Sequence, residues 1–430
     1  MSTSVHTVAE SSAASDLLGA VDERYIAQQI DAFAALTAST VGVTRLAYSP
    51  LERRAHEHFA AQMRSFGLVV STDAAGNTIA ELPGTEPHAA VIGTGSHLDS
   101  VPSGGRFDGV AGVVAAMAVA KAAGERHFAP RRAWRFVAFA GEEGARFGQA
   151  CNGSRIIAGS TATDDLGELV DADGISLREA MESVGIDPSR IAEARWSPED
   201  WAAFVELHIE QGGLLAERSL DVGVVTRISG STRLRVRIEG VASHSGATPM
   251  HLRHDALVTA AACILAGDAT ARDVEHDGTR VTVGTLEVEP GSITTIPGEV
   301  QFTVDIRDID GARQRQTARL LADRFAHIAA ADGTTVVVET MADIDPEALS
   351  EAVASVIATS ADAVGARSCE LPSGASHDSQ QIGRVTAAGM IFVPSRGGLS
   401  HVPEEFTATH EIATGVRVLL ETMTRLDVSR

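Results

Sequence analysis

The chain has 430 residues, of which 44% are hydrophobic, and a formal net charge of −22 at pH 7. This length favours two domains with separate cores. The acidic balance argues against nucleic-acid or anionic-membrane partners, which require clustered Lys and Arg, and favours a small-molecule partner. No apolar run in the sequence reaches membrane-spanning length. Three cysteines without C-x-x-C spacing argue against disulfides and thiolate metal sites, and this favours the reducing cytoplasm.

The first part of the chain has the pattern of an α/β domain. Residues 1–20 are rich in Ser and Ala and lack the features of a signal peptide, so we expect a disordered tail. Apolar residues at helical spacing predict helices between residues 25 and 68. Short apolar runs at 89–93 and 134–140 then flank a helical stretch at 110–123. This alternation is typical of a largely parallel sheet, in which ligands bind beyond the carboxyl ends of the strands.

A different pattern begins near residue 221. Segments 234–238 and 300–306 alternate apolar and polar residues, and an Ala-rich helical stretch, 255–266, lies between them. The alternation predicts an antiparallel sheet with one solvated face and with helices on the other face.

The last part of the chain returns to the α/β pattern, with a helical stretch at 346–361 and an apolar strand at 388–393. We therefore predict an α/β catalytic domain in two parts, 21–221 and 342–430. A smaller α+β dimerisation or lid domain, 222–341, is inserted between them.

Histidines and carboxylates recur just after the apolar runs, where parallel strands would end. They are His97, Asp99, Asp108, Glu142, Glu143, His208 and His401. A mixture of imidazole and carboxylate suits zinc, manganese, cobalt or nickel better than magnesium or calcium. The sequence therefore predicts a two-metal hydrolytic site.

Each of these residues has a simpler interpretation when it is considered alone. A single histidine is more often structural than a ligand, and His244 in particular suits a turn. Asp108 begins a helix and could be its N-cap. Glu142 and Glu143 could form a solvated turn, and Arg307 could be an exposed ion-pair residue. The solvated-turn interpretation does not account for histidines at the other strand ends.

The ordered set of motifs resembles the M20 metallopeptidase superfamily. Within it, the set is most similar to the hydantoinase/carbamoylase-type amidases, which include N-carbamoyl-L-amino acid hydrolases, allantoate amidohydrolases and β-ureidopropionases. The resemblance runs from about residue 44 to residue 404. Its most specific segments are Gly95-Ser96-His97-Leu98-Asp99-Ser100-Val101, Glu142-Glu143-Gly144-Ala145-Arg146-Phe147, Glu206-Leu207-His208-Ile209-Glu210-Gln211-Gly212, His244-Ser245-Gly246-Ala247-Thr248-Pro249-Met250 and Ser373-Gly374-Ala375-Ser376-His377-Asp378.

The resemblance implies a ligand set for two divalent metal ions, expected to be zinc or else manganese, cobalt or nickel. The implied ligands are His97, Asp108, Glu143, His208 and His401, with Asp108 bridging the two ions. Glu142 is implied as the general base that activates a water.

The resemblance also implies substrate contacts. His244 is expected to stabilise the oxyanion in the site of the neighbouring subunit, which implies a homodimer. Arg307 is expected to bind the substrate carboxylate. The remaining expected contacts are Gln211, Thr294, Gly374 and Ala375.

The expected reaction is cleavage of the carbamoyl C–N bond of N-carbamoyl-L-amino acids or allantoate-like ureido acids. The products would be the amino acid, ammonia and carbon dioxide. The alternative is an aminoacylase or dipeptidase on the same scaffold. Thr294 stands where the family usually has Asn, and Ser376 where Gly or Ala is usual, so both departures bear on substrate choice. A non-catalytic relative would be expected to lose the base first, whereas Glu142 is present.

Overall fold

The computed structural model describes residues 16–429, which fall into two compact units. Unit 2 is Arg227–Glu347, and the described residues before and after it form unit 1. Most of the predicted N-terminal tail, residues 1–15, lies outside the described residues. Leu17 is 1% exposed and belongs to the core of unit 1, so folded structure begins before residue 20.

A nine-stranded sheet forms the centre of unit 1, with the order β1-β2-β4-β3-β5-β15-β6-β13 and β14 paired to β6. The four central strands, β4, β3, β5 and β15, run parallel. The pairs β1–β2, β2–β4 and β15–β6 are antiparallel, so the predicted parallel sheet describes the centre and not the flanks. The strands are β1 (Val69–Thr72), β2 (Thr78–Leu82), β3 (Val91–His97), β4 (Trp134–Phe139), β5 (Trp201–Ile209), β6 (Val222–Ile228), β13 (Glu347–Ala348), β14 (Ser368–Ser373) and β15 (Ala388–Val393).

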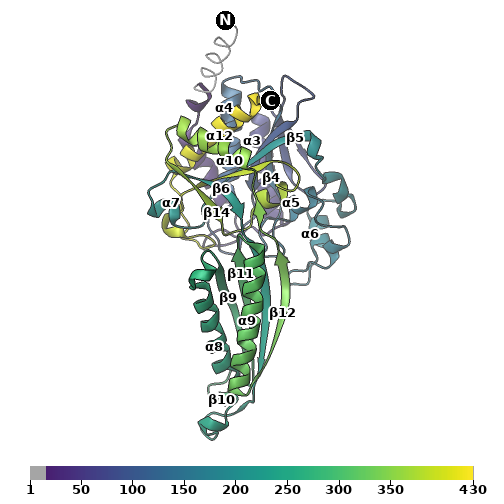
Figure 1. Cartoon of the computed structure of the whole chain (residues 1–430). Helices are drawn as coiled ribbons and strands as arrows, with labels where there is room; N and C mark the ends of the chain where they lie inside the picture. Colours follow the sequence, from purple (N-terminus) through teal and green to yellow (C-terminus); the bar gives the residue numbers. More distant parts are fainter. Residues whose placement is uncertain (1–15, 430) are drawn as a thin grey trace. The chain divides into compact units, whose positions relative to one another are not determined.

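Helices pack on this sheet, as the upper part of Figure 1 shows. α4 (Val110–Glu125) has almost only Ala, Val and Gly up to Ala120, and nearly all of these residues are buried. A helix that is apolar all round is typical of a buried position, and α4 contacts β3, β5 and α12. The other helices are α2 (Glu23–Ala34), α3 (Pro50–Ser65), α5 (Asn152–Ile157), α6 (Leu177–Ser183), α7 (Leu214–Glu217), α10 (Glu351–Ala363), α11 (Asp378–Ile382) and α12 (Thr409–Val428).

Unit 2 has a four-stranded antiparallel sheet with the order β12-β7-β11-β9. Its strands are β7 (Gly230–Glu239), β9 (Arg280–Glu289), β11 (Glu299–Asp308) and β12 (Thr335–Ile344). Leu234, Val236 and Ile238 point to the buried face, where they join the core formed with α8 (Ala256–Ala271) and α9 (Gly311–Asp332). A short ribbon pairs β8 (Ser243–His244) with β10 (Thr295–Ile296). This antiparallel sheet with helices on one face is what the alternation predicts.

The first strand after residue 221 does not follow that alternation. The sequence interpretation placed residues from 222 onward in the inserted domain, whereas β6 pairs with β15 of the nine-stranded sheet. Val222, Val224 and Val225 are all buried, which is typical of a strand covered on both faces. The alternation of unit 2 starts with β7.

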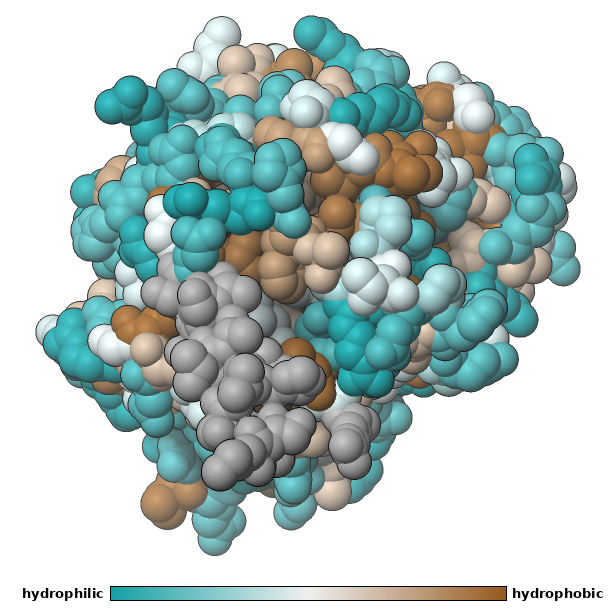
Figure 2. Space-filling model, turned by 90° about the horizontal axis from the view of Figure 1, so that it is seen from above, coloured by the Kyte–Doolittle hydropathy of each residue, from teal (hydrophilic) through white to brown (hydrophobic). Residues whose placement is uncertain are grey.

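Hydrophilic side chains dominate the face seen in Figure 2, and apolar side chains appear there in separate patches. This agrees with the high charge of the sequence. None of the helices within residues 16–429 combines the length and the apolar character needed to cross a membrane.

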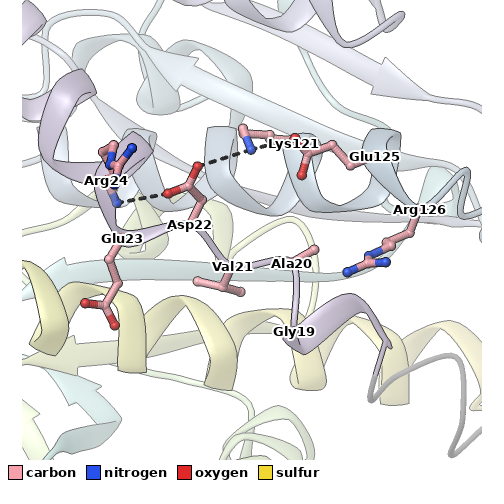
Figure 3. Close-up of a pocket in the computed structure, with 9 residues that line it drawn as sticks. All are labelled: Gly19, Ala20, Val21, Asp22, Glu23, Arg24, Lys121, Glu125 and Arg126. Carbon is pink, nitrogen blue, oxygen red and sulfur yellow. Dashed lines mark hydrogen bonds and ion pairs between the residues drawn. The ribbon is translucent and has the colours of Figure 1, made fainter.

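A pocket of about 660 Å³ lies where the N-terminus of α2 meets the C-terminal half of α4 (Figure 3). Lys121 pairs with two acidic groups of the lining: its Nζ lies 3.4 Å from Asp22 Oδ2 and 2.7 Å from Glu125 Oε1. α4 has 16 residues and is therefore about 24 Å long. Because Asp108 precedes the other end of α4, this pocket is remote from the predicted metal site.

Candidate metal centre

The predicted ligands of unit 1 converge at the carboxyl ends of the parallel strands. His97 is the last residue of β3, His208 is the penultimate residue of β5, and Glu142 and Glu143 follow β4. Glycine permits the close approach: a Cβ on Gly109, which has φ +64°, would collide with the His97 ring. The backbone therefore places the helix N-terminus after Asp108 directly against the first histidine.

Asp108 stands at the centre of this group and turns its two oxygens to different sides. Its Oδ1 lies 3.5 Å from His97 Nε2 and 3.1 Å from His208 Nε2. Its Oδ2 lies 3.3 Å from His401 Nε2, and the same nitrogen lies 3.4 Å from Glu143 Oε1. A carboxylate with this arrangement can bridge two cations.

Among residues 16–429, two groups of side chains have ligand atoms close enough to share an ion. One is His97, Asp108 and His208, which are all buried, and the other is Asp108, Glu143 and His401, of which only His401 is exposed. Imidazole and carboxylate donors fit zinc and its neighbours in the first transition row. Burial raises the pKa of Glu143 well above its usual value, and the Asp108 carboxylate raises it further. A divalent cation between the two carboxylates would relieve this repulsion, so the residues fit such an ion.

Asp99 connects the two sides of the centre. Its Oδ1 lies 3.3 Å from His97 Nδ1, which leaves Nε2 of that ring directed at Asp108. The same carboxylate accepts hydrogen bonds from the backbone N–H groups of Glu142 and Glu143, at 3.0 and 2.9 Å. One buried aspartate thus orients a predicted ligand, His97, and fixes the turn that carries both glutamates.

Glu142 belongs to neither ligand group. Its Oε2 lies 3.8 Å from His97 Nε2, and its Oε1 accepts a hydrogen bond from Cys151 Sγ at 3.1 Å. Burial raises the pKa of Glu142 to about 8, against the lowering effect of His97. A carboxylate beside the predicted ligands with a pKa near neutrality is suited to taking up and releasing a proton.

Three polar side chains outside the two groups support Asp108, the predicted bridging residue. Gln211 Nε2 donates to Asp108 Oδ2 at 2.8 Å, and Ser400 Oγ lies 2.9 Å from the same oxygen. Glu405 accepts hydrogen bonds from the backbone N–H groups of Phe107 and Asp108. Gln211 was expected to contact substrate, and in the structure its amide holds a predicted metal ligand.

Two simpler interpretations from the sequence do not describe this structure. Gly109, and not Asp108, is the N-cap residue of α4, and no side chain caps that helix. Glu142 and Glu143 are 5% and 7% exposed, so they do not form a solvated turn.

Other predicted contacts belong to unit 2. His244 is exposed, and its Nδ1 accepts hydrogen bonds from the N–H groups of Gly246 and Ala247 at 3.0 and 3.2 Å. In a neutral ring the proton then resides on Nε2, which makes that atom a donor. Thr294 lies beside this turn, because its carbonyl accepts from Ser245 N–H at 2.9 Å.

Arg307 lies on β11, where its Nε donates to Asp305 Oδ2 at 2.8 Å. Arg233 Nε lies 3.6 Å from the other oxygen of the same carboxylate. Gly374 and Ala375 belong to unit 1 and directly follow β14, where the Ala375 N–H donates to Ser373 Oγ at 3.1 Å.

Sequence reasoning missed Cys151, Ser400 and Glu405, all of which contact residues of the centre. Ser400 and Glu405 flank His401, so their nearness to a predicted ligand was the available signal. Cys151 carried no signal, because its contact with Glu142 depends on a left-handed backbone conformation, φ 62°, at the start of α5.

Comparison with known proteins adds an independent line of evidence. Residues 93–425 match the model of peptidase family M20/M25/M40. The chain is 41% identical over 406 residues to an N-carbamoyl-L-amino-acid amidohydrolase of Paenarthrobacter aurescens, a match covering 94% of this chain and 97% of the relative. It is 37% identical over 385 residues to an allantoate amidohydrolase of Bacillus subtilis, covering 90% and 93%.

Among solved structures, a hydantoinase/carbamoylase family amidase from Burkholderia multivorans is similar with a TM-score of 0.86 and 31% identity. This match covers 95% of the chain and 98% of that structure. The similarity therefore spans both units and the loops that carry the predicted ligands.

Proposed function

The chain belongs to peptidase family M20/M25/M40, and from this membership we propose that it is a binuclear metal amidohydrolase. Its proposed reaction is hydrolysis of the carbamoyl C–N bond of N-carbamoyl-L-amino acids or related ureido acids. The observation that carries the proposal is the position of Asp108, which belongs to both ligand groups. Glu142 lies beside these groups and belongs to neither. The relatives named above supply the substrate class.

In the proposed mechanism His97, Asp108 and His208 would hold one ion, and Asp108, Glu143 and His401 would hold the other. Bound divalent ions would supply Lewis acidity, which brings the pKa of water towards neutrality. Glu142 takes the proton from water as oxygen attacks the carbamoyl carbon, and then returns it to the leaving nitrogen. The carbamate that leaves decomposes to carbon dioxide and ammonia.

The substrate contacts in this proposal come mainly from unit 2. The Nε2–H of His244 donates to the carbamoyl oxygen as negative charge develops there. Arg307 pairs with the substrate carboxylate, because a guanidinium can bind both oxygens. Thr294 offers one hydroxyl where an amide is usual, so we assign it a role in substrate choice, with Gly374 and Ala375 completing the pocket.

We also propose a homodimer formed through unit 2. Val258 and Leu265 are 61% and 70% exposed on one face of α8, which packs on β9, an edge strand of the sheet. Exposed apolar side chains beside an open strand edge are typical of an association surface. We propose a second copy of the chain as the partner at this surface, because His244 is proposed to act in the active site of the other subunit. The three free cysteines, Cys151, Cys263 and Cys369, favour a cytoplasmic location.

The function is tested by measuring product release from N-carbamoyl amino acids, allantoate, N-acyl amino acids and dipeptides. Each substrate is offered with zinc, manganese, cobalt and nickel in turn. We expect metal-dependent ammonia release from ureido substrates and little turnover of the others. Preferential cleavage of N-acyl amino acids or dipeptides would favour the aminoacylase or dipeptidase alternative instead.

The dimer is tested by mixing two inactive chains, Glu142→Gln and His244→Ala, and reassembling them. Random pairing makes half of the dimers mixed, and each mixed dimer has one intact composite site, so about a quarter of full activity should return. If a verified mixed dimer is as inactive as its parents, His244 does not serve the partner's site.

A further inference from the structure

The loops that carry Asp108 and His401 are joined by a buried carboxylate. Glu405 is 3% exposed, and its Oε1 accepts hydrogen bonds from the backbone N–H groups of Phe107 and Asp108, at 2.8 and 3.1 Å. Glu405 is in neither ligand group. A buried carboxylate that does not bind a cation needs donors of this kind, and here the donors are the backbone of the bridging ligand itself.

The sequence of the first loop leaves room for this contact. A Cβ on Gly105 would collide with the Glu405 side chain, so only glycine at that position lets the carboxylate lie against the loop. The ring of Phe107 also packs edge-to-face on Phe406, with centroids 5.7 Å apart. The two loops therefore meet through both polar and apolar contacts, at Asp108 and just before it.

A hydroxyl group completes the connection at the side chain of the ligand. Ser400 Oγ lies 2.9 Å from Asp108 Oδ2 and 2.8 Å from Glu405 Oε2. Ser400 directly precedes His401. One loop thus supplies a ligand to the second ion position, a partner for the bridging oxygen, and a partner for the backbone of the bridging residue.

We propose that Ser400 and Glu405 are positioning residues that hold Asp108 in its bridging orientation. This inference rests on the proposed function, because it assumes that Asp108 binds both ions. Asp108 can serve both ligand groups only while Oδ1 faces His97 and His208 and Oδ2 faces His401. Glu405 fixes the backbone from which the side chain starts, and Ser400 fixes the rotation of its carboxylate.

The proposal has a consequence for both ion positions. Without the Ser400–Glu405 pair, Gln211 Nε2 still donates to Asp108 Oδ2. This one hydrogen bond holds the carboxylate less firmly than all of the partners together, and rotation of the carboxylate removes one oxygen from each ligand group. We therefore expect weaker binding at the buried position as well as at the position next to His401, although neither Ser400 nor Glu405 is a ligand.

The test compares Zn²⁺ binding to the metal-free forms of the wild type, Ser400→Ala, Glu405→Ala and Glu405→Gln. Glu404→Ala is the matched control, because Glu404 is the exposed neighbour of Glu405. Affinity and stoichiometry are measured by competition with a chromophoric chelator, and thermal melting of each metal-free protein reports its folding. Loss of a residue that orients metal ligands typically weakens metal binding by about 10- to 100-fold.

We expect weakening of that size for Ser400→Ala and Glu405→Ala, and wild-type binding for Glu404→Ala. Glu405→Gln should bind nearly as well as wild type, since its amide oxygen can accept from the two backbone N–H groups and its NH₂ can donate to Ser400 Oγ. Should Glu405→Ala fail to fold, Ser400→Ala still decides the question.

Two results would overturn the inference while the proposed function stands. One is wild-type Zn²⁺ affinity in a folded Ser400→Ala chain, and the other is equal loss in Glu405→Gln and Glu405→Ala. A wild-type chain that binds none of zinc, manganese, cobalt and nickel would instead overturn the proposed function, and this inference with it.

Discussion

The predicted metal ligands of unit 1 and the predicted substrate contacts of unit 2 differ sharply in their surroundings. His97 and His208 are each 1% exposed, and every ligand group contains the hydrogen-bonded Asp108. His244 and Thr294 are exposed. Burying charged and polar groups is costly unless they have partners, so a change in one residue of a dense buried cluster leaves its neighbours without a partner. The residues of such a cluster therefore constrain one another. Exposed residues carry no such folding cost, so a change at Thr294 can alter substrate choice without disturbing the fold.

The largest effect on metal content and turnover should come from substitution of Asp108, the residue that both ligand groups share. Asp108→Ala should lose both ions and all measurable turnover, because both ligand groups contain that carboxylate. His401→Ala should keep one ion in the group of His97, Asp108 and His208. Elemental analysis of the purified proteins gives the stoichiometry directly. Full occupancy in Asp108→Ala would contradict the ligand assignment.

The next largest effect should distinguish the roles of the adjacent Glu142 and Glu143. Glu142→Gln should lower kcat by about 10²- to 10⁴-fold while metal content stays at the wild-type level, because an amide keeps the shape and cannot take up a proton. Glu143→Gln should lower metal content as well. Substantial turnover in metal-loaded Glu142→Gln would remove this residue from the role of base.

A smaller effect is expected from unit 2, at the half-buried Arg307. Arg307→Lys should raise KM for carboxylate-bearing substrates by about tenfold with little change in folding, since an ammonium cannot reproduce a bidentate pair. Arg233→Lys is the matched control, because Arg233 faces the same Asp305 carboxylate. Steady-state kinetics distinguishes the two. Equal changes in both variants would mean that Arg307 acts only through its ion pair.

The parts of the fold that sequence predicted are those set by local pattern. The apolar stretch after Asp108 is helix α4, and the run Ala388–Val393 is strand β15 with the predicted bounds. The alternation at 234–238 and 300–306 identified the sheet of unit 2. In each case the spacing of the apolar residues is that of the element observed, because a helix or strand is stabilised when its apolar residues are buried together.

What sequence could not give depends on contacts between distant residues. The antiparallel flanks β1 and β2 have mostly exposed or half-buried residues, so their pairing is not encoded in an apolar run. The hydrogen bonds from Phe107 and Asp108 to Glu405 join residues 298 and 297 positions apart. Resemblance to a family predicted the metal ligands, whereas the residues that contact those predicted ligands could be identified only from the three-dimensional structure.

The smallest predicted effect concerns acid stability, which should depend on a buried histidine of unit 1 and not on an exposed one of unit 2. Burial lowers the pKa of His56 from 6.5 to about 3, so the unfolded chain takes up this proton first as pH falls. Its contribution to stability is complete above pH 6.5 and is lost progressively towards pH 3. Between pH 7.5 and 5.5 the loss is about 1 kcal/mol, which corresponds to a shift in Tm on the order of 2 °C.

His56→Gln removes this proton uptake, and its amide can still reach Thr78, whose Oγ1 lies 3.0 Å from His56 Nδ1. The metal-free variant should therefore lose less Tm between pH 7.5 and 5.5 than the metal-free wild type, even if its Tm at pH 7.5 is lower. His251→Gln makes the same chemical change at an exposed position of unit 2 and should follow the wild type. Parallel Tm curves for all three proteins would show that His56 does not control acid stability. The difference between buried residues of unit 1 and exposed residues of unit 2 would then concern the metal centre alone. Burial of His56 would not make the stability of the protein depend on pH.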